Sequence, residues 1–209
     1  MLRELRPALV AVVVITLVFG LAYPLAMTGI AQGVFPGKAD GSVIERDGKP
    51  IGSKLIGQDF SRDTGKKDDE GEPILEPDLD YFQSRPSATG YAPDGTFFNN
   101  LGPNQKDLAA LLKENLAAYL AREREFTPGL SRGDVPVDAV TTSASGVDPQ
   151  ISEDNARIQA NRIADKRNLR VERVRELIDE AASRPLFGLG GEKSINVLEL
   201  NLALDKETR

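Results

Sequence analysis

One long apolar stretch near the N-terminus, Pro7 to Ala31, dominates the hydrophobic pattern of this chain and contains no charged residue. A helix of this length reaches about 37 Å, enough to cross a hydrocarbon core of about 30 Å with some tilt. The stretch also resembles a cleaved signal peptide, because Arg3 and Arg6 precede it and small residues surround Gly29. The apolar part of a signal peptide usually spans only about 7–15 residues. The length therefore favours a retained membrane anchor.

The basic residues near the ends of this stretch predict its orientation. Arg3 and Arg6 precede it, whereas Lys38 is followed by carboxylates as well as by further basic residues. Because Lys and Arg accumulate on the cytoplasmic side of a membrane, the pattern favours an N-terminus inside and the bulk of the chain outside. We therefore expect two parts. Residues 1–33 form a cytoplasmic tip and a single transmembrane helix, and residues 34–209 form a soluble extracytoplasmic domain.

Four small residues fall on one face of the predicted helix, namely Ala22, Ala26, Gly29 and Gly33. In lipid, small residues let a second helix approach closely, and Gly-x-x-x-Gly is a frequent form of such a contact. The spacing predicts a face that packs against a partner helix, although Ala and Gly are common enough in such helices for the spacing to arise by chance. Pro24 predicts a bend in the second half of the helix.

The pattern beyond the apolar helix alternates between short β-prone runs and amphipathic helices. Two short runs around Asp47-Gly48 predict a β-hairpin. The charged segment Asp59–Asp80 predicts an exposed irregular loop. An apolar stripe at helical spacing predicts a helix from about residue 104 to residue 123, with Asn104 as its N-cap.

The sequence of the C-terminal part predicts one further strand and two helices, followed by a segment whose structure is ambiguous. Asp138–Thr142 fits a buried strand, and Ser152 fits the N-cap of a helix whose inner face is rich in alanine. A second helix follows, with Val174 among its inward residues. The run Ser194–Leu204 begins with strand alternation and then fits either a strand or a helix. The fold class predicted is α+β: one N-terminal transmembrane helix followed by a mixed α/β extracytoplasmic domain.

Composition narrows the possible chemistry. The chain has a net charge of −6, which disfavours nucleic acid and anionic membrane surfaces as partners. It contains no Cys and no His. There is therefore no disulfide framework, no thiolate and no imidazole base or zinc ligand. No paired carboxylates, nucleophile with a base, or metal-ligand set stands out. We expect no catalytic residues and no metal site in this chain.

Three short motifs invite a phosphate-related interpretation. Asp63-Thr64-Gly65 lacks the Lys of the phosphorylated Asp-Lys-Thr-Gly motif of P-type ATPases, so it is rejected. Gly188–Ser194 resembles a P-loop, but Glu192 separates Gly from Lys, and a turn is the favoured interpretation. Ser143–Ser152 combines hydroxyls, a Gly and a following helix N-terminus, which could hold a phosphate or carboxylate. Ordinary capping of a strand–loop–helix junction explains the same residues and is favoured.

Four separated blocks, in order, resemble the family of C subunits of Kdp potassium-transporting ATPases, known as KdpC. The blocks are Tyr81–Ala88, Asn100–Asn104, Val140–Ser152 and Val197–Asp205. The resemblance runs from the apolar helix to about Asp205. It implies an accessory subunit of a bacterial plasma-membrane complex that hydrolyses ATP and imports potassium. The implied partners are a potassium-selective channel-like A subunit, a P-type ATPase B subunit and a small single-span F subunit.

The same resemblance implies a candidate nucleotide site. The family's proposed role as a catalytic chaperone raises the ATP affinity of the ATPase subunit through a Ser-Gly-x-Asp-Pro region. On this sequence the residues are Ser143, Ser145, Gly146, Asp148 and Gln150. ATP is cytoplasmic, whereas the predicted domain lies outside, so direct nucleotide binding is disfavoured. A membrane-anchored extracytoplasmic binding module without a pump is the alternative function.

Overall fold

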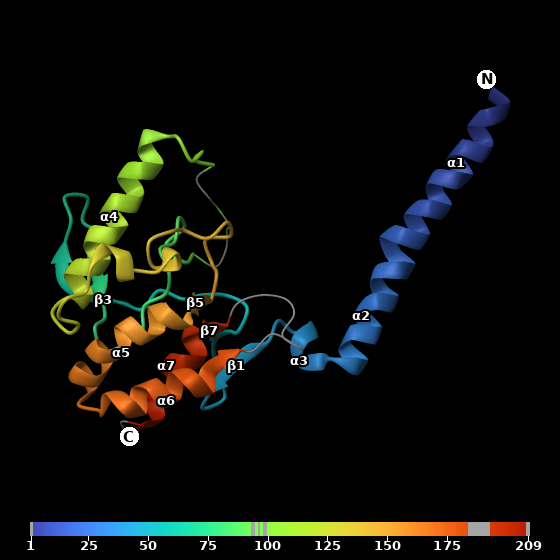
Figure 1. The fold of residues 1–209 in the computed structure, drawn as a ribbon. Coiled ribbons are helices and arrows are strands. Elements are labelled where there is room, and N and C mark those ends of the chain that lie inside the picture. The colour runs from blue at the N-terminus through green and yellow to red at the C-terminus, as the bar shows by residue number, and fades with distance from the viewer. Residues whose placement is uncertain (1, 93–94, 96, 98–99, 184–192, 208–209) are drawn as a thin grey trace. The chain divides into compact units, whose positions relative to one another are not determined.

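The computed structural model describes residues 2–92, 95, 97, 100–183 and 193–207. Most of the predicted turn at Gly188–Ser194 lies outside the described residues. The chain divides into two compact units, Met1–Ser53 and Lys54–Arg209. Helices and strands both contribute, which confirms the α+β class (Figure 1).

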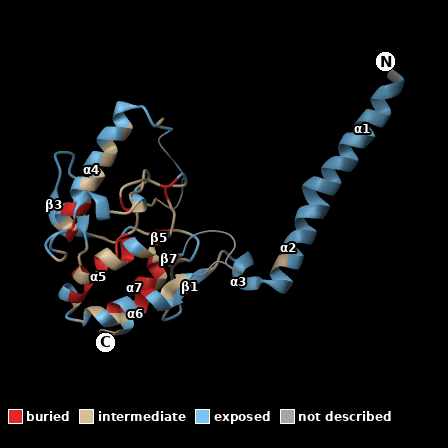
Figure 2. Ribbon diagram, viewed as in Figure 1, coloured by how far each residue is buried: buried red, intermediate tan, exposed pale blue. Residues whose placement is uncertain are grey.

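The first unit consists of a long helical segment and a hairpin. Its elements are α1 (Leu2–Leu17), the π-helical turn η1 (Val18–Ala22), α2 (Tyr23–Val34), α3 (Pro36–Ala39), β1 (Val43–Arg46) and β2 (Lys49–Ser53). Among the described residues, one helical stretch, Arg3–Val34, is long and apolar enough to cross a membrane. Its side chains are exposed along nearly the whole length (Figure 2).

The π-helical turn has a local cause in the sequence. Pro24 has no backbone N–H and cannot donate to the preceding turn. Just before it, the Tyr23 N–H donates to the carbonyl of Val18, five residues back, rather than four. A single π-helical turn of this kind lets a helix continue past a disturbance in its hydrogen bonding. The π-helical turn lies directly before Pro24, and the bend predicted there stays a prediction.

The first hairpin forms as the sequence predicts. β1 pairs antiparallel with β2, and Arg46 lies opposite Lys49. Asp47 and Gly48 form the two-residue turn, with φ angles of 54° and 73°. Positive φ at both positions is what a type I′ turn requires, and Asp-Gly accommodates it well.

The second unit holds the remaining elements. They are β3 (Ser61–Lys67), β4 (Pro73–Pro77), α4 (Lys106–Glu123), the 3₁₀ turns η2 (Arg132–Asp134) and η3 (Val137–Ala139), β5 (Gln150–Ser152), α5 (Glu153–Arg167), α6 (Val171–Ala181), β6 (Ala182–Ser183), β7 (Ser194–Asn196) and α7 (Val197–Glu207). The small sheet has the order β5-β7-β6 and is antiparallel throughout. Helices α5, α6 and α7 cluster beside it (Figure 1).

Two apolar clusters form the interior of this unit. The larger cluster combines α5, α6, α7, the sheet and Phe82, which is completely buried. The predicted inner faces of α5 and α6 are confirmed, because Ala156, Ala160 and Ile163 are buried and Val174 is completely buried. A smaller cluster is built on Tyr119 and Leu120 of α4, together with Leu130 and Ala139. Figure 2 shows the buried residues concentrated in these helices.

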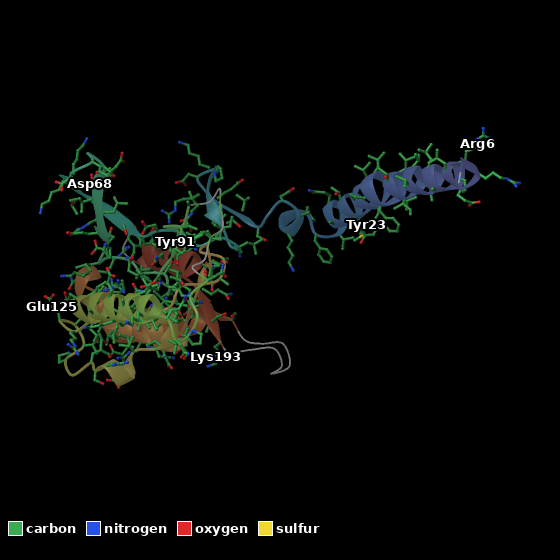
Figure 3. The ribbon with its side chains drawn as sticks, turned by 90° about the horizontal axis from the view of Figure 1, so that it is seen from above. Arg6, Tyr23, Asp68, Tyr91, Glu125 and Lys193 are labelled. Carbon is green, nitrogen blue, oxygen red and sulfur yellow. The ribbon has the colours of Figure 1, made fainter. Side chains whose placement is uncertain are left out.

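The segment Asp59–Asp80 is a hairpin, so the predicted irregular loop is wrong. β3 and β4 pair antiparallel around a turn in which the Asp68 carboxylate accepts the backbone N–H groups of Glu70 and Glu72. The expected exposure is nevertheless confirmed for β4, which is exposed along its whole length. Charged residues on both faces hide the strand alternation on which the sequence prediction depends. Figure 3 shows Asp68 at the outer end of this hairpin.

The predicted strand at Asp138–Thr142 is also wrong. The 3₁₀ turn η3 occupies this position, and the backbone N–H groups of Val140 and Thr141 both donate to the carbonyl of Val137. The turn follows from a tertiary contact. The Asp138 carboxylate accepts the backbone N–H of Ser152 at 2.9 Å and its hydroxyl at 2.7 Å.

The helix starts are partly as predicted. Ser152 caps α5, because its hydroxyl accepts the N–H of Asn155 at 3.2 Å. For α4 the N-cap is Gln105 and not Asn104. The Gln105 side chain accepts the N–H of Gly102 at 2.6 Å, which stabilises a turn just before the helix. The ambiguous run after Ser194 is a short strand followed by the helix α7.

Candidate functional site

The segment Tyr81–Gln83 lies against α5 and α7 through side-chain amides rather than through another strand. Asn201 of α7 accepts the Phe82 N–H at 2.9 Å and donates to the Phe82 carbonyl at 3.0 Å. Gln159 of α5 bonds the next residue in the same way. Its Oε1 accepts the Gln83 N–H at 2.8 Å, and its Nε2 donates to the Gln83 carbonyl at 3.1 Å. Each amide thus replaces a peptide group, and the buried backbone is satisfied without a β-ladder.

Arg162 extends this network into the interior of the unit. Its side chain is completely buried, and its Nε donates to both carboxylate oxygens of Glu123 at 3.1 Å. Its remaining donors bond the carbonyls of Leu79 and Tyr81 and the side chain of Gln159. Burial lowers the pKa of Arg162, and the adjacent Glu123 carboxylate opposes that shift. The ion pair with Glu123 orients the Arg162 guanidinium, and the guanidinium in turn holds the Leu79 and Tyr81 carbonyls in place.

Asn155 links the network to the loop that precedes α5. Its Oδ1 accepts from the Tyr119 hydroxyl at 3.0 Å and from Gln159 at 3.0 Å, and its Nδ2 donates to Asp138 at 2.9 Å. Burial raises the pKa of Tyr119, and Glu123 adds to this shift. The hydroxyl therefore stays protonated and continues to donate. The network joins α4, α5 and the turn η3.

The segment Thr141–Asp148 is held by Arg85. The guanidinium donates to the Asp148 carboxylate at 3.0 Å, to the Thr141 hydroxyl at 3.1 Å and to the carbonyls of Thr141 and Thr142. The Asp148 carboxylate also accepts the N–H of Gln150 at 3.0 Å. Both charges are partly buried, with 20 % and 29 % of the side chains exposed, so their pairing is screened less than a surface pair.

Gly146 lies at the centre of a close approach between two loops. Its φ is 75°, and a Cβ at this position would be 2.9 Å from the Thr89 side chain. The Gly146 carbonyl accepts hydrogen bonds from the hydroxyls of Ser87 and Thr89. The Gly146 N–H donates to the Ser143 hydroxyl at 2.8 Å. Only glycine satisfies this conformation and this spacing together.

Tyr91 stabilises the loop that contains Arg85 and Ser87. Its hydroxyl donates to the Arg85 carbonyl at 2.6 Å, and burial raises its pKa to about 12. The phenol therefore remains neutral and a donor at physiological pH. Gly57 packs against its ring, where a Cβ would be 2.5 Å from the nearest ring atom. Figure 3 labels Tyr91 and Lys193 on this unit.

Two of the five residues predicted to contact nucleotide line one groove of the structure. Asp148 and Gln150 line a polar groove of about 450 Å³, together with Arg85, Ser152 and Lys193. The predicted residues Ser143, Ser145 and Gly146 are absent from the described lining of this groove. The Ser143 and Ser145 hydroxyls lie 3.2 Å apart, and Ser145 also accepts the N–H of Val147. Their polar groups stabilise the loop itself.

Two basic residues of this groove, Arg85 and Lys193, each form an ion pair with a carboxylate. Arg85 falls within the sequence block Tyr81–Ala88. Its pairing with Asp148 was not predicted, because the two residues lie far apart in the chain. Lys193 is paired with Glu153 at 3.2 Å. The pKa of the Glu153 carboxyl is lowered by its hydrogen bonds from Arg157 and Lys193. Nucleotide contact by Ser143, Ser145, Gly146, Asp148 and Gln150 stays a prediction.

The small-residue face of the apolar helix is open in the described structure. Ala22, Ala26, Gly29 and Gly33 are all exposed. A Cβ at Gly29 or Gly33 would meet no atom within 4 Å. The face therefore has room for the backbone of a second helix, although its packing partner stays a prediction.

The described fold and polar site define a class of protein in which an α+β unit follows one candidate membrane helix. A family model described as "K+-transporting ATPase, c chain" matches residues 5–206. The chain is 46% identical to the potassium-transporting ATPase KdpC subunit of Bradyrhizobium diazoefficiens, over 99% of this chain and 98% of that protein. It is 45% identical to the KdpC subunit of Caulobacter vibrioides, over 98% and 94%. The chain belongs to the KdpC family, which confirms the resemblance carried by the four sequence blocks.

Proposed function

We propose that this chain is the accessory C subunit of an ATP-driven, high-affinity potassium import complex. The observation that carries the proposal is the family match over residues 5–206, which includes both the apolar helix and the α+β unit. In this proposal the chain assembles with a channel-like A subunit, a P-type ATPase B subunit and a small single-span F subunit. Potassium is the transported ion, and the B subunit hydrolyses ATP.

The proposed location is the bacterial plasma membrane, with one crossing. Arg3–Val34 supplies the anchor, the N-terminus is cytoplasmic, and the α+β unit is extracytoplasmic. The support is the length of the apolar helix together with the distribution of basic residues around it. The alternative function, an anchored binding module without a pump, requires the same topology but no partner subunits.

The proposed mode of action is structural support of the pump rather than chemistry. The hydroxyls of Ser143 and Ser145 and the Asp148 carboxylate are engaged in bonds within the chain. This engagement favours a rigid surface for protein contact over a nucleotide cradle. The catalytic-chaperone role, in which these residues contact ATP, requires a cytoplasmic domain and so makes an opposite prediction about topology.

The absence of native cysteine makes that topology directly measurable. We expect an Asp69→Cys variant in intact spheroplasts to react with a membrane-impermeant maleimide, because Asp69 lies on the exposed hairpin turn. A Glu4→Cys variant should react only after the membrane is permeabilised. Labelling is read by mass spectrometry of the full chain. The reverse pattern would place the domain beside cytoplasmic ATP and favour the nucleotide-binding alternative.

A further inference from the structure

An apolar groove of about 470 Å³ runs along one face of α4. Its walls are the helix face that carries Ala109, Leu112 and Leu116, and the segment that carries Val135, Val137 and Val140. The helical residues are spaced three and four apart, so they form one continuous stripe. The 3₁₀ turn η3 packs against α4.

The groove residues are incompletely covered by the described part of the chain. Leu112 and Leu116 are only half-buried, whereas Tyr119 and Leu120, further along the same helix, are buried. Val137, on the rim, is 73 % exposed, which is more than any large apolar side chain of the candidate membrane helix. Single exposed apolar residues are ordinary on protein surfaces, but a concave group of six is typical of a binding groove.

The lining of this groove is positively charged, although the chain as a whole is acidic. The charged residues in its lining are Lys113 and Arg132, and both are cations. Neither has a carboxylate partner within ion-pair distance among the described residues, although the chain as a whole has a net charge of −6. An occupant that satisfies the groove therefore carries apolar side chains on one face and carboxylates at its edges.

We infer that this groove binds a short acidic, amphipathic segment from a partner subunit of the transport complex. The inference rests on the proposed function, because that function supplies the partner. A membrane surface fits less well, since recognition of anionic lipids typically uses clusters of about 4–8 basic residues and not two. The concave apolar floor also suits inserted side chains better than a flat layer of headgroups.

Charge reversal on the rim tests the inference. A tagged full chain that carries Lys113→Glu and Arg132→Glu is purified in mild detergent, and the co-purified A and B subunits are quantified. We expect roughly fivefold less recovery of the partners than with the wild type, because two attractive charge pairs become repulsive. The matched control carries Lys106→Glu and Arg170→Glu, two exposed positions outside the groove lining, and should recover the partners as the wild type does.

Photo-crosslinking from p-benzoylphenylalanine in place of Leu112 identifies the occupant in the assembled complex. The inference predicts a crosslinked peptide of a partner subunit that contains Asp or Glu beside apolar residues. Lipid adducts alone would overturn it in favour of the membrane, and a peptide from a second copy of this chain would overturn it in favour of self-association. Wild-type recovery by the groove variant would overturn the inference alone. Failure of the wild-type chain to recover any partner would overturn the proposed function itself.

Discussion

Replacing Arg162 with methionine is expected to lower the free energy of unfolding by about 3 kcal/mol, the lower end of the range for breaking a buried ion pair. The buried Glu123 carboxylate would lose two hydrogen bonds from Arg162 and retain one from Arg122 at 2.8 Å. The carbonyls of Leu79 and Tyr81 would also lose a donor. Urea unfolding of the full chain in detergent, followed by circular dichroism, measures the change.

Two further variants separate the buried pair from arginine in general. Arg157 lies on the same helix with a side chain that is 37 % exposed, and it pairs with Glu153 and Asp179. Arg157→Met should therefore cost less than about 1 kcal/mol, as exposed pairs do. Combining Arg162→Met with Glu123→Leu should recover part of the loss, because the fully buried carboxylate is removed together with its buried partner, while Arg122, which is partly exposed, loses its ion pair. Equal unfolding midpoints for Arg157→Met and Arg162→Met would contradict the role assigned to the network.

Replacing Gly29 and Gly33 together with leucine is expected to reduce recovery of the partner subunits roughly tenfold, because bulky side chains prevent close approach of a second helix in lipid. Both positions have open space around the Cα in the described structure. The variant should therefore leave the helix of the isolated chain intact. Recovery is measured by quantifying the A, B and F subunits that co-purify with the tagged chain.

The control for this variant places leucine elsewhere on the same helix. Thr28→Leu with Ala31→Leu adds similar bulk on the other side and should leave partner recovery unchanged. Loss of partners in both double variants would indicate a general effect on the helix. Unchanged recovery for Gly29→Leu with Gly33→Leu would remove the small-residue face from the proposed interface.

Local signals account for the parts of the fold that the sequence predicts correctly. The Asp47-Gly48 turn, the Ser152 cap and the alanine-rich face of α5 each depend on residues close together in the chain. The second hairpin was missed because its strands carry charges on both faces. The turn at Asp138 was missed because a contact with Ser152, at the start of α5, determines it.

The polar interior could not be predicted from one sequence. Asn155, Gln159 and Arg162 share a helix face with the buried alanines, yet polar residues at such positions normally indicate solvent. Their burial is possible because each has a polar partner. Asn155 bonds Tyr119 and Asp138, Gln159 bonds the Gln83 backbone, and Arg162 bonds Glu123. The same reasoning applies to Arg85 and Asp148, which form a pair only after distant segments fold together.

The most direct test of the proposed function is recovery of the complex from potassium-limited cells. A tagged full chain, extracted in mild detergent, should bring down a channel-like potassium-selective subunit and a P-type ATPase subunit in stoichiometric amounts. The recovered complex should hydrolyse ATP in a potassium-dependent manner. Recovery of the chain alone under potassium limitation, with both partners expressed in the same cells, would contradict the account and favour an anchored binding module without a pump.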